Sequence, residues 1–341
     1  ETLPYFPTVL FPLIGAIVGL FFGSIVGYVS TRRAGTAFAM ISLGFCEMVT
    51  AMTLIFVIFF NGEDGIQTDR MVGPEPFGVS FGPQIEVYYL ILFWVLLTVA
   101  LMYIITKTPF GRMSNAVRDN PERAAFIGYS VRRVRWQAFA LSSMFAGAAG
   151  SLHAINYEHI GFESVSVVQS GAVLFMAFIG GAGHFLGPII GAIGLTYLDS
   201  TLADITEAWL LYLGLTFSGI VMFAPGGLAG LIVMHGPIAR TDKNLLISLI
   251  KPYLLAIGSV ITGLLGLIGI IEMLYFRSLI SKGEGEIIIF WTEFNANGIL
   301  SWLIFIGLIL LGIFLSKRTF PVAKESWDNA ISVVKTEISN E

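Results

Sequence analysis

Apolar residues form long continuous blocks along this chain, and most charged residues gather between the blocks. A helix needs about 20 apolar residues to cross the roughly 30 Å hydrocarbon core of a bilayer. Because the apolar positions surround each helix rather than alternate, the pattern is not that of a transmembrane β-barrel. We therefore predict an all-α, polytopic helical membrane protein with about nine transmembrane helices, at residues 9–29, 36–60, 86–106, 136–157, 166–183, 185–203, 208–224, 253–276 and 297–316.

The fifth and sixth predicted helices are separated only by the stretch from Gly180 to Pro188. Such a short connection suits a tight turn between two crossing helices, and it equally suits a re-entrant segment buried in protein or facing a water-filled cavity. The sequence leaves both arrangements open.

Composition supports the membrane assignment. The chain is 55% hydrophobic and 12% charged, with a mean hydropathy of +0.81, whereas soluble domains carry about 25% charged residues. A net charge of −4 argues against nucleic acid as a partner. The single cysteine, Cys46, excludes a disulfide framework, and the four histidines lack metal-ligand spacing, so we predict no metal site. The expected surroundings are a lipid bilayer.

Most Lys and Arg residues fall into four groups, and an even number of predicted helices separates each group from the next. By the positive-inside rule, all four groups face the cytoplasm. The N-terminus is then expected outside and the C-terminus in the cytoplasm, with acidic loops outside. The groups lie at Arg32–Arg33, Lys107–Arg135, Arg240–Lys251 and Lys317–Arg318.

The segment from Lys107 to Arg135 holds seven of the 19 basic residues. Thr108-Pro109 and Asn120-Pro121 each place a capping residue before a proline, which predicts two helix starts. The second helix ends near Gly128 and is about 10 Å long. Two short capped helices suit a rigid knob that inserts into a partner's cleft; a positive-inside loop with incidental structure is the alternative.

The sequence from Phe110 to Ala154 resembles the cytoplasmic loop and following helix of permease subunits of ABC importers for branched-chain amino acids. Further blocks match in order, so that the resemblance covers about residues 10–235. The matching blocks include Arg33-Ala34-Gly35, Ala116-Val117-Arg118-Asp119-Asn120, Ala146-Gly147-Ala148-Ala149-Gly150, Gly180-Gly181-Ala182-Gly183 and Pro225-Gly226-Gly227-Leu228-Ala229-Gly230-Leu231.

This resemblance implies an ABC importer permease fold in a bacterial inner membrane. It also implies a passive pore, not an enzyme, that works with a homologous second permease subunit, two ATP-binding subunits and a periplasmic solute-binding protein. The chain contains no Gly-Lys dipeptide and therefore no Walker-type loop, so ATP and Mg²⁺ are expected in the partner subunits and no cofactor in this chain. The helix at 121–128 would be the coupling helix, and the implied coupling residues are Arg112, Arg118, Asp119, Glu122, Arg123, Ala124, Ala125 and Gly128.

Small and polar residues inside the predicted helices suggest further roles. A repeat of Gly15, Gly19, Gly23 and Gly27 predicts a helix-packing face. Glu47 is an acid deep in a predicted helix and should face the protein interior or a cavity. A structural role and substrate contact are both open for Glu47. The candidate translocation path comprises Ser42, Glu47, Gly180, Gly181 and Gly183, although a tight turn explains the glycines equally well.

The chain departs from the family at both ends. It begins at Glu1 without an initiator Met, and we expect the natural protein to extend upstream. We predict a permease core over 1–243 with the coupling loop at 107–135. The remaining part, 244–341, is predicted to add two transmembrane helices and a short cytoplasmic tail.

Two other functions are considered. A permease for urea or short amides belongs to the same class, and the residues do not distinguish it. An ion-coupled secondary transporter would use Glu47 as its coupling site. The scarcity of other intramembrane acids and the ordered loop at 107–135 count against that alternative.

Overall fold

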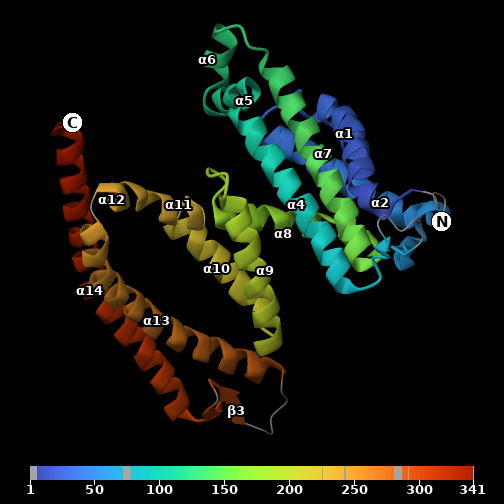
Figure 1. The fold of residues 1–341 in the computed structure, drawn as a ribbon. Helices are drawn as coiled ribbons and strands as arrows, with labels where there is room; N and C mark the ends of the chain where they lie inside the picture. Colours follow the sequence, from blue (N-terminus) through green and yellow to red (C-terminus); the bar gives the residue numbers. More distant parts are fainter. Residues whose placement is uncertain are drawn as a thin grey trace. The chain divides into compact units, whose positions relative to one another are not determined.

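The computed structural model describes residues 6–71, 78–224, 226–241, 243–279, 286–290 and 292–340. Most of its elements are α-helices (Figure 1). The two sheets found in these ranges are both antiparallel strand pairs. Six of the helices are long and apolar enough to cross a membrane, which confirms the prediction of an all-α polytopic membrane protein. The chain divides into two compact units, Glu1–Leu174 and Phe175–Glu341.

The first unit contains four long helices. Between them lie short helices and one small strand pair, in which Ile66 pairs with Ile160 and Gln67 with His159. In chain order its elements are η1 (Thr8–Leu10), α1 (Phe11–Ser30), α2 (Thr36–Ile55), α3 (Val57–Phe60), η2 (Gly62–Asp64), β1 (Ile66–Gln67), α4 (Gln84–Lys107), α5 (Pro109–Asp119), α6 (Pro121–Phe126), α7 (Val131–Tyr157), β2 (His159–Ile160), η4 (Phe162–Val165) and the first half of α8 (Val167–Gly180).

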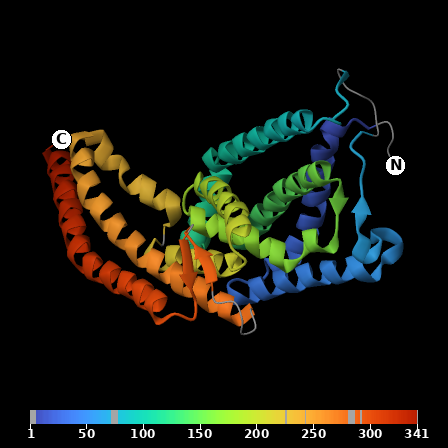
Figure 2. The ribbon, with the colours of Figure 1, turned by 90° about the horizontal axis from the view of Figure 1, so that it is seen from below.

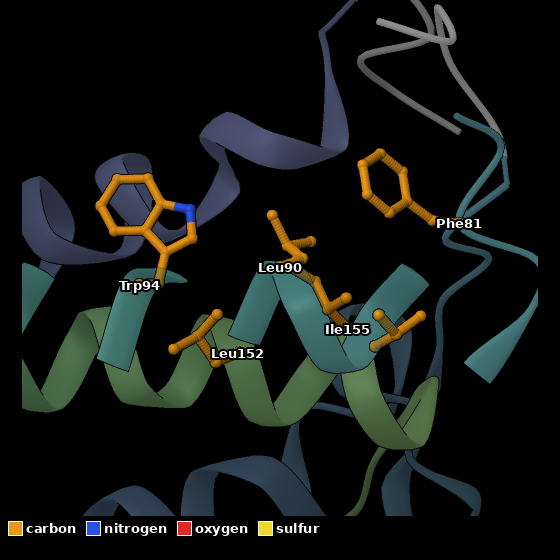
Figure 3. Packing of buried hydrophobic residues seen from close by; sticks show 6 residues of the cluster. Phe81, Leu90, Trp94, Leu152 and Ile155 are labelled. Atoms are coloured by element: carbon orange, nitrogen blue, oxygen red, sulfur yellow. The ribbon is translucent and has the colours of Figure 1, made fainter. Parts of the chain in front are cut away.

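A small apolar core joins α4 and α7 at one end of this unit. Figure 3 shows Leu90 and Trp94 of α4 beside Leu152 and Ile155 of α7. The Trp94 indole donates a hydrogen bond to the Val9 carbonyl at 2.9 Å, so the start of the chain is attached to the same core. This bond satisfies the polar end of an otherwise buried ring.

An arginine network holds the irregular segment after β1 against the end of α7. Arg70 donates hydrogen bonds to the carbonyls of Phe81 and Gly82 at 2.8 and 3.0 Å, and its Nε lies 3.8 Å from the Glu158 carboxylate. The Arg70 backbone amide also donates to Glu158 at 3.1 Å. Arg70 was not predicted from the sequence as a structural residue.

The basic groups at 32–33 and 107–135 lie at the opposite end from Arg70. Arg32 and Arg132 both place their guanidinium groups over the Tyr28 ring, 4.8 and 4.9 Å from its centroid. The two groups therefore share one end of the first unit, as the positive-inside argument requires. The side chains of Arg240 and Lys243, from the third predicted group, lie outside the described part of the chain.

The second unit contains shorter helices followed by a long helical hairpin. The described hairpin helices α13 and α14 lie side by side along most of their length (Figures 1 and 2). The unit includes the second half of α8, α9 (Gly187–Ile205), α10 (Trp209–Phe223), α11 (Gly227–Met234), α12 (Gly236–Thr241), α13 (Lys243–Leu279), β3 (Glu286–Ile289), β4 (Thr292–Asn295) and α14 (Ile299–Asn340).

The hairpin helices are much longer than the predicted spans at 253–276 and 297–316. At 1.5 Å per residue, helices of 37 and 42 residues extend about 55 and 63 Å, well beyond the hydrocarbon core. The predicted tail is therefore a continuation of α14. Its Ala330 and Val334 pack against Ile238 and Leu249 in a buried cluster.

The structure has fewer clear spans than the nine predicted. Within the described ranges, six helices qualify by length and composition, and a seventh if α10 and α11, bent by 43°, form one span. Helix α8 has 14 residues and reaches only about 21 Å. Helix α9 carries Asp199 and Asp204, which lower its mean hydropathy. The difference lies in residues 166–224, where three spans were predicted and where the described helices are short, less apolar or bent. In another apolar run the backbone leaves the helical region at Phe56, so α2 ends before the predicted boundary.

The sequence-based division at 243/244 separates family-like sequence from added helices. The boundary between the two compact units lies within α8, between Leu174 and Phe175, and the division at 243/244 stays a prediction. Two residues named in the sequence-based predictions, Glu1 and Pro225, lie outside the described residues.

Candidate coupling surface and intramembrane polar sites

The segment predicted as a knob consists of two capped helices, α5 and α6. The Thr108 hydroxyl accepts a hydrogen bond from the Gly111 amide at 3.4 Å, and the Asn120 side chain accepts one from the Arg123 amide at 2.9 Å. A proline occupies the first position of each helix. Both predicted helix starts are therefore correct, because capping and proline geometry act locally.

The end of α6 is also as predicted. Gly128 has a φ of +97°, a backbone conformation that disfavours other residues. Its amide donates to the Ala125 carbonyl at 2.9 Å, and the Tyr129 amide donates to the Ala124 carbonyl at 3.1 Å. These bonds satisfy carbonyl groups at the end of α6 and turn the chain toward α7.

Three small or branched apolar residues hold the knob in place. Ala124 of α6, Val117 of α5 and Val134 of α7 form one buried cluster, in which Ala124 is only 2% exposed. The inward position of Ala124 means that its small side chain serves packing within this chain. A larger side chain at this position would push α6 away from its neighbours.

The outward side of the knob is charged at its start and apolar at its tip. Glu122, Arg123 and Ala125 are exposed, while Phe126 and Ile127 are 91% and 70% exposed. Two large apolar side chains on a short polar helix are typical of a contact surface. Phe126 and Ile127 were not predicted as contact residues, although the run Ala-Ala-Phe-Ile in a basic segment was a usable signal.

The remaining predicted coupling residues lie on α5. Arg112, Arg118 and Asp119 are exposed, and Arg118 donates to the Asp119 carboxylate at 3.0 Å. With side chains 64% and 66% exposed, this ion pair contributes little to stability. The two residues are therefore available to a partner.

Glu47 and Ser42 point in different directions from α2. The Glu47 side chain is exposed on the surface of the first unit, and no ion pair or hydrogen bond of its carboxylate is found in the described ranges. The Ser42 hydroxyl is buried, with no hydrogen-bond partner among the same residues. The structure does not bring these two candidate path residues together. Next to Glu47, Cys46 and Thr50 instead contact the Val165 carbonyl at 3.7 and 3.0 Å.

The glycines near 180 form a backbone junction. A Cβ atom at Gly180 would collide with the Gly187 carbonyl, and one at Gly181 with the Gly226 carbonyl. Gly181 also has a φ of +106°. Gly183 differs from both because it is exposed and faces open space. The contacts of Gly180 and Gly181 are those of a tight turn between packed helices.

The glycine repeat of α1 faces α7. A Cβ atom at Gly15 would meet Gly147 and Ser151, and one at Gly19 or Gly23 would meet Ser143. Gly27 lies against the Phe139 ring. The repeat thus places the two backbones in close contact, in the manner of small-residue interfaces between membrane helices.

A second acid, Glu272 of α13, has partners in the second unit. Its carboxylate accepts hydrogen bonds from the Thr206 hydroxyl at 2.7 Å and the Tyr212 hydroxyl at 2.8 Å. Glu272 was not singled out from the sequence, because its partners lie 66 and 60 positions away along the chain. The described residues contain no group of three or more side chains suited to a metal ion.

Comparison with known proteins identifies similar sequences. A family model described as "Branched-chain amino acid transport system / permease component" matches residues 4–226. The high-affinity branched-chain amino acid transport system permease protein LivM of Escherichia coli (strain K12) is 29% identical over 227 residues, covering 60% of this chain and 53% of that protein.

Other similar proteins carry different substrate names. The autoinducer 2 import system permease protein LsrC of Klebsiella pneumoniae is 28% identical, covering 55% of this chain and 53% of that protein. The fructose import permease protein FrcC of Rhizobium meliloti is 25% identical, with coverage of 58% on both sides.

The chain spans about half the length of the curated relatives that it matches. No solved structure matches the chain. The family model nevertheless covers well over half of the 341 residues and includes the knob, the α1–α7 interface and the glycine junction. This chain therefore belongs to the family of permease components of branched-chain amino acid transport systems.

Proposed function

We propose that this chain is the membrane permease subunit of an ATP-driven importer for branched-chain or related small amino acids, in a bacterial inner membrane. It pairs with a homologous second permease subunit, two ATP-binding subunits and a periplasmic solute-binding protein. ATP and Mg²⁺ are bound by the ATP-binding subunits. The basic end of the first unit faces the cytoplasm, in keeping with the positive-inside rule.

The observation that carries this proposal is the knob formed by α5 and α6. It combines two capped helices with a buried attachment through Ala124 and an exposed tip at Phe126. A rigid attachment transmits force better than a mobile loop, because a partner's movement displaces the whole element. In the proposed mechanism, closure of the ATP-binding subunits moves the knob, and α5 and α7 pass this movement to the membrane helices.

Branched-chain amino acids are preferred because the family description and LivM both carry that substrate name. Fructose, autoinducer 2 and urea or short amides are the competing substrates. Uptake of radiolabelled leucine into cells that depend on this chain tests the preference directly. Competition by excess isoleucine and valine is expected, and competition by fructose or urea alone would overturn the amino acid assignment.

Charge reversal on the knob tests the coupling role. Glu122→Lys and Arg123→Glu should abolish leucine uptake and release the ATP-binding subunits during purification, while the amount of chain in the membrane stays unchanged. Glu325→Lys, at an exposed glutamate of α14, is the matched control and should behave like the unmodified protein. Normal uptake and assembly in both knob variants would contradict the coupling role.

The energy source separates this proposal from a secondary transporter. Vanadate, which arrests ATP-driven transporters, should stop uptake into right-side-out vesicles when it is loaded into them together with ATP. A proton or sodium ionophore should leave the initial rate unchanged. The opposite pattern would favour ion coupling through Glu47.

A further inference from the structure

A cavity of about 480 Å³ opens at the basic end of the first unit. Its volume is in the range of ligand pockets. The turn between α1 and α2, the start of α2, helix α5 and the start of α7 all contribute to its wall. All of these elements belong to the first unit, and the cavity is open on one side and lies beside the knob.

Three arginines reach this cavity: Arg33 from the turn, Arg118 from α5 and Arg135 from α7. No acidic side chain is among the described residues that line it. Arg118 is paired with Asp119, whereas no ion pair or hydrogen bond of the Arg33 and Arg135 side chains is found in the described part of the chain. The cavity therefore concentrates positive charge, which favours an anionic ligand.

The rest of the wall is largely apolar. Phe38 and Phe139 pack edge to face with ring centroids 6.1 Å apart, and Val134 and Ala138 extend this surface along α7. A small anion such as phosphate would leave this apolar surface in water, whereas an acyl chain would cover it. The lining therefore suits a ligand with an anionic head and a hydrocarbon tail.

Neighbouring aromatic residues mark the membrane surface at this level. Tyr28 and Trp136 form an edge-to-face pair, and the Trp136 indole donates to the Ser24 carbonyl at 2.8 Å. Tyr and Trp are enriched where membrane helices meet the headgroup region. Arg32 and Arg132 cover the Tyr28 ring from the basic side.

We propose that this cavity binds an anionic phospholipid, with its phosphate at Arg33 and Arg135 and an acyl chain along Phe38 and Phe139. Basic pockets between membrane helices are a recognised means of holding such headgroups. The site does not depend on the transported substrate. Because Val117 and Arg118 of α5 line the same cavity, the bound lipid would contact the knob and support its position.

Native mass spectrometry of the purified full chain tests this proposal. Phosphatidylglycerol, phosphatidylcholine and inorganic phosphate are titrated separately. Phosphatidylglycerol should bind, whereas phosphatidylcholine should bind far more weakly. The double variant Arg33→Gln/Arg135→Gln should bind phosphatidylglycerol on the order of thirtyfold more weakly, since each basic residue contributes about fivefold.

Two further variants separate the effect of the arginine charges from the effect of the free volume of the cavity. Ala34→Trp keeps all three arginines but fills the cavity from the exposed turn, and it should also lose phosphatidylglycerol. Arg133→Gln removes an exposed arginine of α7 outside the cavity and should bind normally. Equal binding by all variants, or equal binding of both phospholipids, would overturn the proposal. Displacement of phosphatidylglycerol by millimolar inorganic phosphate would assign the arginines to free phosphate instead.

Discussion

The Tyr212 hydroxyl of α10 donates a 2.8 Å hydrogen bond to the Glu272 carboxylate of α13. This bond joins the family-like part of the chain to the C-terminal hairpin formed by α13 and α14. A carboxylate in an apolar helix is costly unless polar groups satisfy it. Tyr212 and Thr206 supply those groups, so that Glu272 anchors the hairpin to the preceding helices of the second unit.

Removal of the Tyr212 hydroxyl should weaken this anchor. Tyr212→Phe is expected to lower the free energy of unfolding by about 1 to 2 kcal/mol, because the Glu272 carboxylate loses one of two charged hydrogen bonds. Thermal unfolding of the purified protein in detergent measures the change. Tyr197→Phe, at an exposed tyrosine of α9, is the control and should have no effect. Equal stability of the two variants would show that the Tyr212 bond contributes nothing.

The α1–α7 interface should reject a large side chain at Gly147. A Cβ atom there meets the Gly15 backbone, and Gly147→Leu is expected to lower stability by about 1 to 3 kcal/mol as the helices separate. Gly150→Leu provides a control on the same helix, because nothing lies within 4 Å of a Cβ atom at that position. Unfolding temperatures and protein levels in the membrane distinguish the two. A greater loss in Gly150→Leu would place the interface on another face of α7.

The tip and the base of the knob should respond differently to substitution. Phe126→Ala removes a side chain that is 91% exposed, so stability should not change. Uptake should fall at least tenfold if Phe126 is a central contact with a partner. Ala124→Leu overfills the buried cluster and should instead lower the unfolding temperature. Normal uptake by Phe126→Ala would remove the tip from the coupling surface.

Glu47 should face water or a partner within the assembled transporter. An isolated charge facing lipid at mid-bilayer costs about 2.5 to 3.5 kcal/mol. In a Cys46→Ala background, Glu47→Cys is therefore expected to react with a charged, membrane-impermeant thiol reagent. Val49→Cys, exposed on the opposite side of α2, is the control and should react slowly. Protection of Glu47→Cys in the assembled transporter but not in the isolated chain would assign Glu47 to a subunit contact.

Features that depend on nearby residues were predictable from sequence. The two helix starts at Pro109 and Pro121 and the turn at Gly128 follow from capping residues, proline and glycine within a few positions. The all-α membrane fold was also predictable from sequence, because the thickness of a bilayer sets the length of the apolar segments that cross it.

Features that depend on distant residues were not predictable. Arg70 finds its partners at Phe81, Gly82 and Glu158 only after the chain has folded, and Glu272 finds Thr206 in the same way. Helix ends inside apolar runs were also missed, since hydropathy does not change where the backbone bends. The break at Phe56 is an example, and it is the reason that α2 ends before the predicted boundary.

The glycine junction has a mechanical consequence for transport. Backbone meets backbone where Gly180, Gly187 and Gly227 come together, and no side chain lies between them to change rotamer or slide. We therefore expect the adjoining ends of α8, α9 and α11 to move together, because close backbone contact leaves little room for one helix to slide past another. Any movement of these helices relative to one another is then expected to require bending at positions away from the junction.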